Sequence, residues 1–259
     1  MSPLPWYDVT GPPAGPPVVL LHAFPLSSTV FDRLRRHLDG SRVVRVDLPG
    51  LGRSAPAAVG EPSVAAMADA VVAVLDAEGV ERAVVLGVST GGYVALELAA
   101  RHPDRVSGLV LGSTTTRVIE PDVPAQRRAL ADELDATGDL DALVKGADAG
   151  LGRTALREQP TLLPLLQEVV AASDPVGVAW VARAVAGRRD TTADLAAYDG
   201  PVLLLFGDED TETPPVRAAE MAAARGARAT RTVVLARTGH LTVLERPLQA
   251  AAALLDMVG

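Results

Sequence analysis

Ser89 is the residue of this chain best placed to act as a nucleophile. It lies in Gly-Val-Ser-Thr-Gly, residues 87–91, between the apolar run at 84–86 and a segment with helical periodicity. A serine at a sharp strand-to-helix turn exposes its hydroxyl, as in a nucleophile elbow. Gly87 and Gly91 fit this turn because side chains there would collide. The alternative is a glycine-rich turn needed only for packing, so the chemistry depends on the partners of Ser89.

A serine nucleophile needs a base, usually histidine, and a carboxylate that orients it. Of the four histidines, His240 follows Gly239 in a loop just past an expected strand, where a base can extend over the sheet. A loop hydrogen bond or a cap would explain a single such histidine equally well. His37 and His102 are expected at solvated helix positions, and His22 ends another expected strand.

The orienting carboxylate is expected in an acidic turn after the apolar run at 202–206. Four acidic side chains in this turn are candidates: Asp208, Glu209, Asp210 and Glu212. Most of them must be simply solvated. Serine, then acid, then histidine, each at the end of a successive strand, is a chain order known for one large class of hydrolases.

Five motifs in this order resemble those of the α/β-hydrolase fold superfamily along nearly the whole chain. They are His-Ala-Phe-Pro at 22–25, Asp-Leu-Pro-Gly-Leu-Gly-Arg-Ser at 47–54, the serine turn at 87–92, the acid loop at 207–214 and Gly-His-Leu-Thr-Val-Leu-Glu-Arg-Pro at 239–247. Within the superfamily the chain is similar to the 3-oxoadipate enol-lactonase-like group of esterases and lactonases. Its aromatic-Pro pair at 24–25 also resembles that of cofactor-free haloperoxidases and perhydrolases.

The resemblance implies a catalytic triad of Ser89, His240 and Asp210, with no metal or organic cofactor. It also implies that the backbone N–H groups of Phe24 and Thr90 form the oxyanion hole. The expected substrate contacts are His22, Ala23 and Trp180. The chain departs from the family pattern at two of these positions, where alanine replaces the usual glycine at 23 and threonine replaces the common methionine or glutamine at 90.

The elements that must position these residues alternate between strands and helices. Strands are expected at 6–9, 17–22, 42–48, 83–88, 106–111, 202–206 and 232–235. Helices are expected at 30–38, 63–76, 90–101, 215–224 and 247–257. The strands are continuous apolar runs, which is typical of a parallel sheet covered on both faces. We therefore expect an α/β fold with the mostly parallel α/β-hydrolase sheet flanked by helices.

Residues 117–190 interrupt this alternation with helical patterns alone. The patterns cover 124–136, 140–147, 162–172 and 176–186. A helical insertion between two parallel strands favours a lid over their carboxyl ends, with a structural excursion as the alternative. We expect a core of 1–116 and 191–259 and a helical cap of 117–190.

The cap composition bears on the substrate. The cap is rich in Leu, Val and Ala, which favours an apolar acyl or alcohol group. Three cap arginines can bind a substrate carboxylate, although a solvated helix end explains them better: Arg183, Arg188 and Arg189.

The overall composition excludes other classes of function. The chain has 259 residues, a formal net charge of −8 and no basic run, which disfavours binding to nucleic acid or anionic membranes. It has no cysteine, so thiolate catalysis and disulfides are excluded. No signal-like N-terminus or apolar span of about 20 residues is evident, so a cytoplasmic protein is expected.

The function expected from the sequence is hydrolysis of a small-molecule carboxylic ester or lactone through an acyl-enzyme. Two alternatives remain open. One is a cofactor-free perhydrolase or haloperoxidase that uses the same triad, and the other is a non-catalytic binding protein with this fold.

Overall fold

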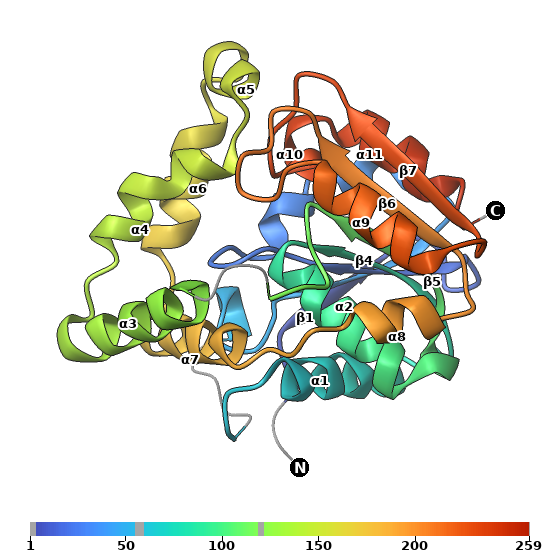
Figure 1. Ribbon diagram of the computed structural model, residues 1–259, viewed down its shortest axis with the longest axis horizontal. Helices are drawn as coiled ribbons and strands as arrows, with labels where there is room; N and C mark the ends of the chain where they lie inside the picture. The colour runs from blue at the N-terminus through green and yellow to red at the C-terminus, as the bar shows by residue number, and fades with distance from the viewer. Residues whose placement is uncertain (1–3, 55–59, 119–121, 259) are drawn as a thin grey trace.

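A seven-stranded sheet forms the centre of the molecule (Figure 1). The computed structural model describes residues 4–54, 60–118 and 122–258. The strand order is β1-β3-β2-β4-β5-β6-β7. The strands are β1 (Tyr7–Thr10), β2 (Pro17–Leu21), β3 (Arg42–Val46), β4 (Ala83–Val88), β5 (Val106–Gly112), β6 (Val202–Gly207) and β7 (Thr230–Leu235). All neighbours pair in parallel except β1, which is antiparallel to β3.

The burial of the strands explains their apolar runs. Every residue of β4 and β6 is buried, because both faces of the central sheet are covered. Successive residues of β2 face opposite sides, so that Val19 and Leu21 belong to one core cluster while Val18 and Leu20 belong to the other. The expected α/β-hydrolase sheet is confirmed.

Helices cover the two faces of this sheet. One core cluster lies under α1 (Val64–Ala77), α2 (Thr90–Arg101), α8 (Thr192–Ala197) and α9 (Val216–Arg225). The other lies under η1 (Ser28–Phe31), η2 (Leu34–His37), α10 (Thr242–Glu245) and α11 (Pro247–Leu255). Two further 3-10 turns, η3 (Gly52–Ser54) and η4 (Pro103–Arg105), lie in the connections. Helix α1 begins where expected because the Ser63 hydroxyl accepts a hydrogen bond from the Ala66 amide at 3.0 Å.

The prediction of one helix over 30–38 is wrong. Its apolar residues are buried as expected, but the backbone forms the two short 3-10 helices η1 and η2. The break falls at Asp32, the C-cap of η1, whose carboxylate binds the guanidinium of Arg45 on β3 at 2.5 Å. A contact with a distant strand therefore overrides the local helical periodicity.

The segment between β5 and α8 is helical. It contains α3 (Asp122–Thr137), α4 (Asp141–Lys145), η5 (Gly146–Gly150), α5 (Arg153–Glu158), α6 (Leu162–Ala171) and α7 (Pro175–Ala186). The four expected helical patterns correspond to α3, α4 with η5, α6 and α7, whereas α5, α8 and α10 were not expected. Figure 1 shows these helices gathered at one side of the molecule, with α3 beside α7 and α4 beside α6.

Across the described ranges, no single helix is long and apolar enough to cross a membrane. Helices α6 and α7 have the length and composition of a membrane span only when they are taken together, and they are bent by 100° relative to each other.

Candidate active site

Ser89 lies at the sharp turn between β4 and α2. Its backbone has φ +52° and ψ −114°, a conformation that a non-glycine residue rarely adopts and that marks functional sites. A Cβ on Gly87 would lie 2.2 Å from the Gly91 carbonyl oxygen, and one on Gly91 would lie 2.2 Å from the Leu21 carbonyl oxygen. The glycines therefore allow close backbone approach on both sides of the serine.

The His240 ring is hydrogen-bonded to the Asp210 carboxylate. Its Nδ1 lies 3.0 Å from Oδ2 and 3.1 Å from Oδ1, and both side chains are buried. Since a carboxylate only accepts, Nδ1 carries the proton and Nε2 is left as the basic nitrogen. Asp210 Oδ1 also accepts from the backbone amides of Glu212 at 3.0 Å and Thr213 at 2.8 Å, which fix its orientation.

Ser89 and His240 line the same cavities. One has a volume of about 200 Å³ and the other about 640 Å³, and both residues contribute to each wall. Among the described residues the Ser89 hydroxyl makes no hydrogen bond, either to His240 or to another residue, and it lies at the wall of both cavities. The structure thus brings together the three residues predicted from the sequence at the carboxyl ends of β4, β6 and β7.

Phe24 and Thr90 lie at the smaller cavity. The Thr90 amide belongs to the first turn of α2, where helices leave N–H groups without an intrahelical acceptor. The Phe24 amide donates to no backbone acceptor among the described residues. Ala23 also lines this cavity. These positions suit two donors to a developing oxyanion, with the α2 dipole adding to the attraction.

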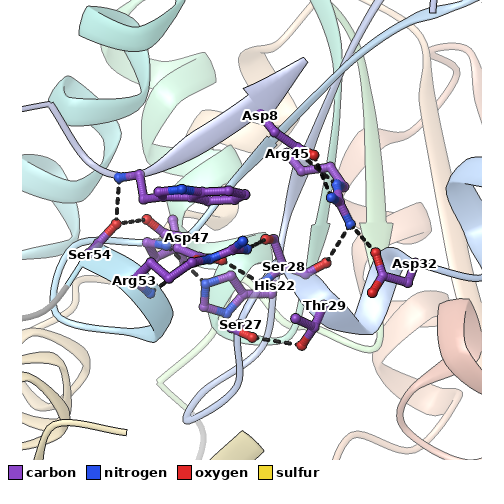
Figure 2. Close-up of polar contacts among 12 residues, drawn as sticks. Asp8, His22, Ser27, Ser28, Thr29, Asp32, Arg45, Asp47, Arg53 and Ser54 are labelled. Atoms are coloured by element: carbon purple, nitrogen blue, oxygen red, sulfur yellow. Dashed lines mark hydrogen bonds and ion pairs between the residues drawn. The ribbon is translucent and has the colours of Figure 1, made fainter. Parts of the chain in front are cut away.

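His22 connects the loop that follows β2 to the loop that follows β3, and it does not line the described cavities. The ring is fully buried, with Nδ1 donating to the Ala23 carbonyl and Nε2 accepting from the Leu48 amide, each at 2.9 Å (Figure 2). Burial lowers the pKa of His22, although Asp47 and the Ala23 carbonyl act in the opposite direction. The structure thus places His22, an expected substrate contact, in a hydrogen bond between two loops.

Asp47 organises the loop at 47–54, which follows β3 (Figure 2). Its carboxylate accepts from the Ser28 amide at 2.8 Å and from both the amide and the guanidinium of Arg53 at 2.9 Å. Burial alone would raise the pKa of Asp47, but Arg53, His22 and Ser28 outweigh it and lower the pKa. Ser54 closes the loop by donating to the Asp47 carbonyl at 2.6 Å.

Trp180 also lies away from the cavities. Its indole Nε1 donates to the Gly60 carbonyl at 2.9 Å, which ties α7 to the segment before α1. The structure thus places Trp180, an expected substrate contact, in a hydrogen bond to this connection. Arg183 and Arg189 are likewise engaged elsewhere: Arg183 pairs with Asp132 and Asp135 of α3, and Arg189 with Glu97 and Asp194.

The sequence model for the alpha/beta hydrolase fold matches residues 16–247. The chain belongs to this family. As a resemblance to individual proteins, it is 34% identical over 264 residues to a pimeloyl-[acyl-carrier protein] methyl ester esterase of Neisseria meningitidis, covering 95% of this chain and 78% of that protein.

Solved structures of this α/β-hydrolase fold agree with the assignment. A thermophilic esterase from Thermogutta terrifontis, with malate bound, superposes with a TM-score of 0.91 at 31% identity, covering 98% of this chain and 94% of that one. The enol-lactonase from Burkholderia xenovorans LB400 has a TM-score of 0.86 at 24% identity, over 97% and 95% of the two chains, which shows a common fold. The enzyme class predicted from the sequence, carboxylic-ester hydrolase, is confirmed at this level.

Two glutamates of this α/β hydrolase, outside the predicted triad, join the loops of Asp210 and His240 to the helical insertion. Glu209 accepts from the Thr154 amide at 2.8 Å and the Thr154 hydroxyl at 2.7 Å. Glu245 Oε2 accepts from the Gly239 amide at 2.8 Å and the Gly152 amide at 3.3 Å. The first glutamate is next to Asp210 and the second holds the residue before His240, so the insertion and the triad loops share supports.

The pKa values of these two carboxyls shift in opposite directions. Burial raises the pKa of Glu245, which its backbone hydrogen bonds offset only in part, and its Oε1 is buried without a partner among the described residues. Burial alone would also raise the pKa of Glu209, but hydrogen bonds from Thr154 and the ion pair with Arg153 lower it. Ionisation of Glu245 therefore opposes folding, whereas ionisation of Glu209 favours it.

The Glu245→Gln variant is expected to differ from the wild type in how stability depends on pH. Because the folded pKa of Glu245 lies above an unfolded value of about 4.3, its contribution is full below that pH and declines as the pH rises through the folded pKa. The variant should lack this decline in urea unfolding measured from acid to neutral pH. Glu209→Gln is the matched control, since its lowered pKa predicts stability that is lost as the pH falls. Parallel profiles of Glu245→Gln and wild type would contradict this assignment.

Proposed function

We propose that this α/β hydrolase is a serine esterase that works through an acyl-enzyme on Ser89. The observation that carries the proposal is the buried hydrogen bond of His240 to Asp210, at the cavity that Ser89 also lines. A base with a fixed tautomer, at the same cavity as a serine on a strained turn, is the arrangement that activates a hydroxyl when substrate binds.

In this mechanism Ser89 Oγ attacks the ester carbonyl while its proton passes to His240 Nε2. The negative charge on the carbonyl oxygen is stabilised by the amides of Phe24 and Thr90. Asp210 stabilises the imidazolium through Nδ1 and is not itself protonated. His240 then gives the proton to the departing alkoxide, which leaves as the alcohol. A water that gives its proton to His240 attacks the acyl carbonyl, and His240 returns the proton to Ser89 Oγ as the bond to the acyl group breaks and the carboxylic acid leaves.

The walls of the smaller cavity favour a short apolar group. Its volume of about 200 Å³ is bounded by side chains of the oxyanion loop, η5, α4, α6 and the His240 loop, among them Leu26, Leu143, Leu166, Val170 and Leu241. Because α4 and α6 supply much of this wall, we infer that the insertion at 117–190 acts as a cap that selects the substrate. A methyl ester is the bond named for the Neisseria relative, and the methyl group of such an ester suits a cavity of this size.

Ester hydrolysis is favoured over the two alternatives. The relatives that are more than 30% identical over most of the chain, such as the Neisseria and Thermogutta proteins, are named as esterases, which supports hydrolysis over perhydrolysis or halogenation. The engaged His240–Asp210 pair supports catalysis over binding alone, because a vestigial site has no need to preserve it.

Labelling with a fluorophosphonate probe tests the proposal. Intact mass spectrometry should show one phosphonyl adduct on the wild type and none on Ser89→Ala, because only an activated serine attacks the probe. Hydrolysis of short-chain methyl esters should disappear with the labelling. A folded wild type that gives no adduct and cleaves no ester would overturn the proposal and favour a binding protein.

A further inference from the structure

A second lobe opens from the same catalytic residues and is lined by cations. The larger cavity, of about 640 Å³, shares Ser89 and His240 with the smaller one and is called here the cationic lobe. The charged side chains in its wall are Arg127, Arg188, Arg217 and Glu212. Three guanidinium groups against one carboxylate make this wall positive, in a chain whose formal net charge is −8.

Arg127 differs from the other two arginines of the lobe. The Arg188 guanidinium stacks on the Tyr93 ring at 4.2 Å and bonds the Arg117 carbonyl, and Arg217 pairs with Glu220 at 2.9 Å. In the described part of the chain, Arg127 has neither an ion pair nor a hydrogen bond. Its guanidinium carbon lies 4.8 Å from the centre of the Phe24 ring.

The placement of Arg127 has an energetic cost that an anion would offset. The side chain is half-buried at a position that borders both lobes. Burial lowers the pKa of Arg127, while Tyr93 and Glu212 act in the opposite direction. A guanidinium stays charged under these conditions, and five N–H donors without acceptors favour a planar anion that can bind two of them. The stack on Phe24 fixes the guanidinium beside the residue whose amide faces the oxyanion.

We propose, resting on the esterase function above, that Arg127 binds a carboxylate of the substrate and selects esters of dicarboxylic acids with one free acid group. The ester carbonyl lies at Ser89 and the free carboxylate in the cationic lobe. The small alcohol group and the methylene chain lie against the apolar side chains of the cavity walls. A monoanion matches the lobe better than a phosphate dianion, because Glu212 already supplies one negative charge there.

Pairs of methyl esters that differ only in a terminal carboxylate test this assignment. Monomethyl succinate, adipate and suberate are compared with methyl butanoate, hexanoate and octanoate at neutral pH. The wild type should favour the best half-ester over its neutral partner by about 10- to 100-fold in kcat/KM, the range of a charge-assisted hydrogen bond. Arg127→Gln should lose this preference, because kcat/KM for the half-esters should fall about 10-fold or more beyond any fall for the neutral esters.

Arg128→Gln is the matched control. Arg128 is the next residue of α3, is exposed, and its replacement makes the same change in net charge. It should leave both classes of ester within about threefold of the wild type, because screened surface charges contribute little. Equal losses in Arg127→Gln and Arg128→Gln, or equal rates for half-esters and neutral esters in the wild type, would overturn the proposal.

Binding to Ser89→Ala separates this proposal from the esterase function. Calorimetry with monomethyl adipate needs no turnover, so it reports on the cationic lobe even if Ser89 is not a nucleophile. Binding that Arg127→Gln weakens about 10-fold or more supports the carboxylate site. Adipate and inorganic phosphate are then compared as competitors. Competition by phosphate alone, or binding unaffected by Arg127→Gln, would contradict a carboxylate site.

Discussion

Ser89→Ala is expected to lower kcat for ester hydrolysis by about 10⁴- to 10⁶-fold, and adding His240→Ala should cost almost nothing more. The reason is that the serine hydroxyl and the imidazole act as one unit, in which the base has no proton to take once the hydroxyl is gone. What remains in the double variant is binding and oxyanion stabilisation by Phe24 and Thr90. Steady-state kinetics of the two single variants and the double variant measure this directly. Losses that simply multiply would show that Ser89 and His240 act independently.

Asp210→Asn belongs to the same experiment. An asparagine can donate to Nδ1 and reverse the tautomer, which leaves Nε2 protonated and unable to act as a base, so a loss of about 10⁴-fold is expected. Asp208→Asn is the matched control, since Asp208 lies in the same turn, is exposed and, among the residues that the structure describes, its side chain accepts only from the Thr238 amide at 3.2 Å. Near-equal activities of the two asparagine variants would remove Asp210 from the triad.

The sequence contains enough information to predict the sheet and the triad because both depend on local patterns. The buried strands are continuous apolar runs, and the serine turn needs glycines at fixed positions. Asp210 was separated from three neighbouring carboxylates only by resemblance, and its distinguishing contact is tertiary: it accepts a hydrogen bond from His240 on a distant loop. The hydrophobic periodicity of the sequence cannot predict such a contact.

Which side chains line the cavity was harder to predict, because the direction of a side chain depends on its neighbours. His22 and Trp180 are polar aromatic residues at plausible positions, yet each hydrogen-bonds a connecting segment. Arg127 was missed, although a signal exists. It lies four and seven residues before Ala131 and Leu134, which are fully or almost fully buried, so it belongs to the inward face of α3. An arginine on the inward face of α3 is the sequence signal that favours the anion site proposed above.

Gly91→Ala is expected to destabilise the fold by about 3 kcal/mol or more, the upper range for overpacking. The added methyl would lie 2.2 Å from the Leu21 carbonyl oxygen and 2.8 Å from that of His22, and backbone cannot yield as a flexible side chain does. The shift must fall on the end of β2 or the start of α2. Urea unfolding followed by circular dichroism measures the change in free energy.

The same displacement should reduce catalysis in the molecules that remain folded. The end of β2 leads directly to Phe24, and the start of α2 carries the Thr90 amide, so a shift of either element misplaces a donor to the oxyanion by tenths of an ångström. Gly146→Ala is the control for stability, because a Cβ there meets no atom within 4 Å, and its midpoint should stay within about 1 kcal/mol of the wild type. If Gly91→Ala kept wild-type stability and kcat, the close approach of α2 to β2 would not be what holds Ser89 and the oxyanion donors in register.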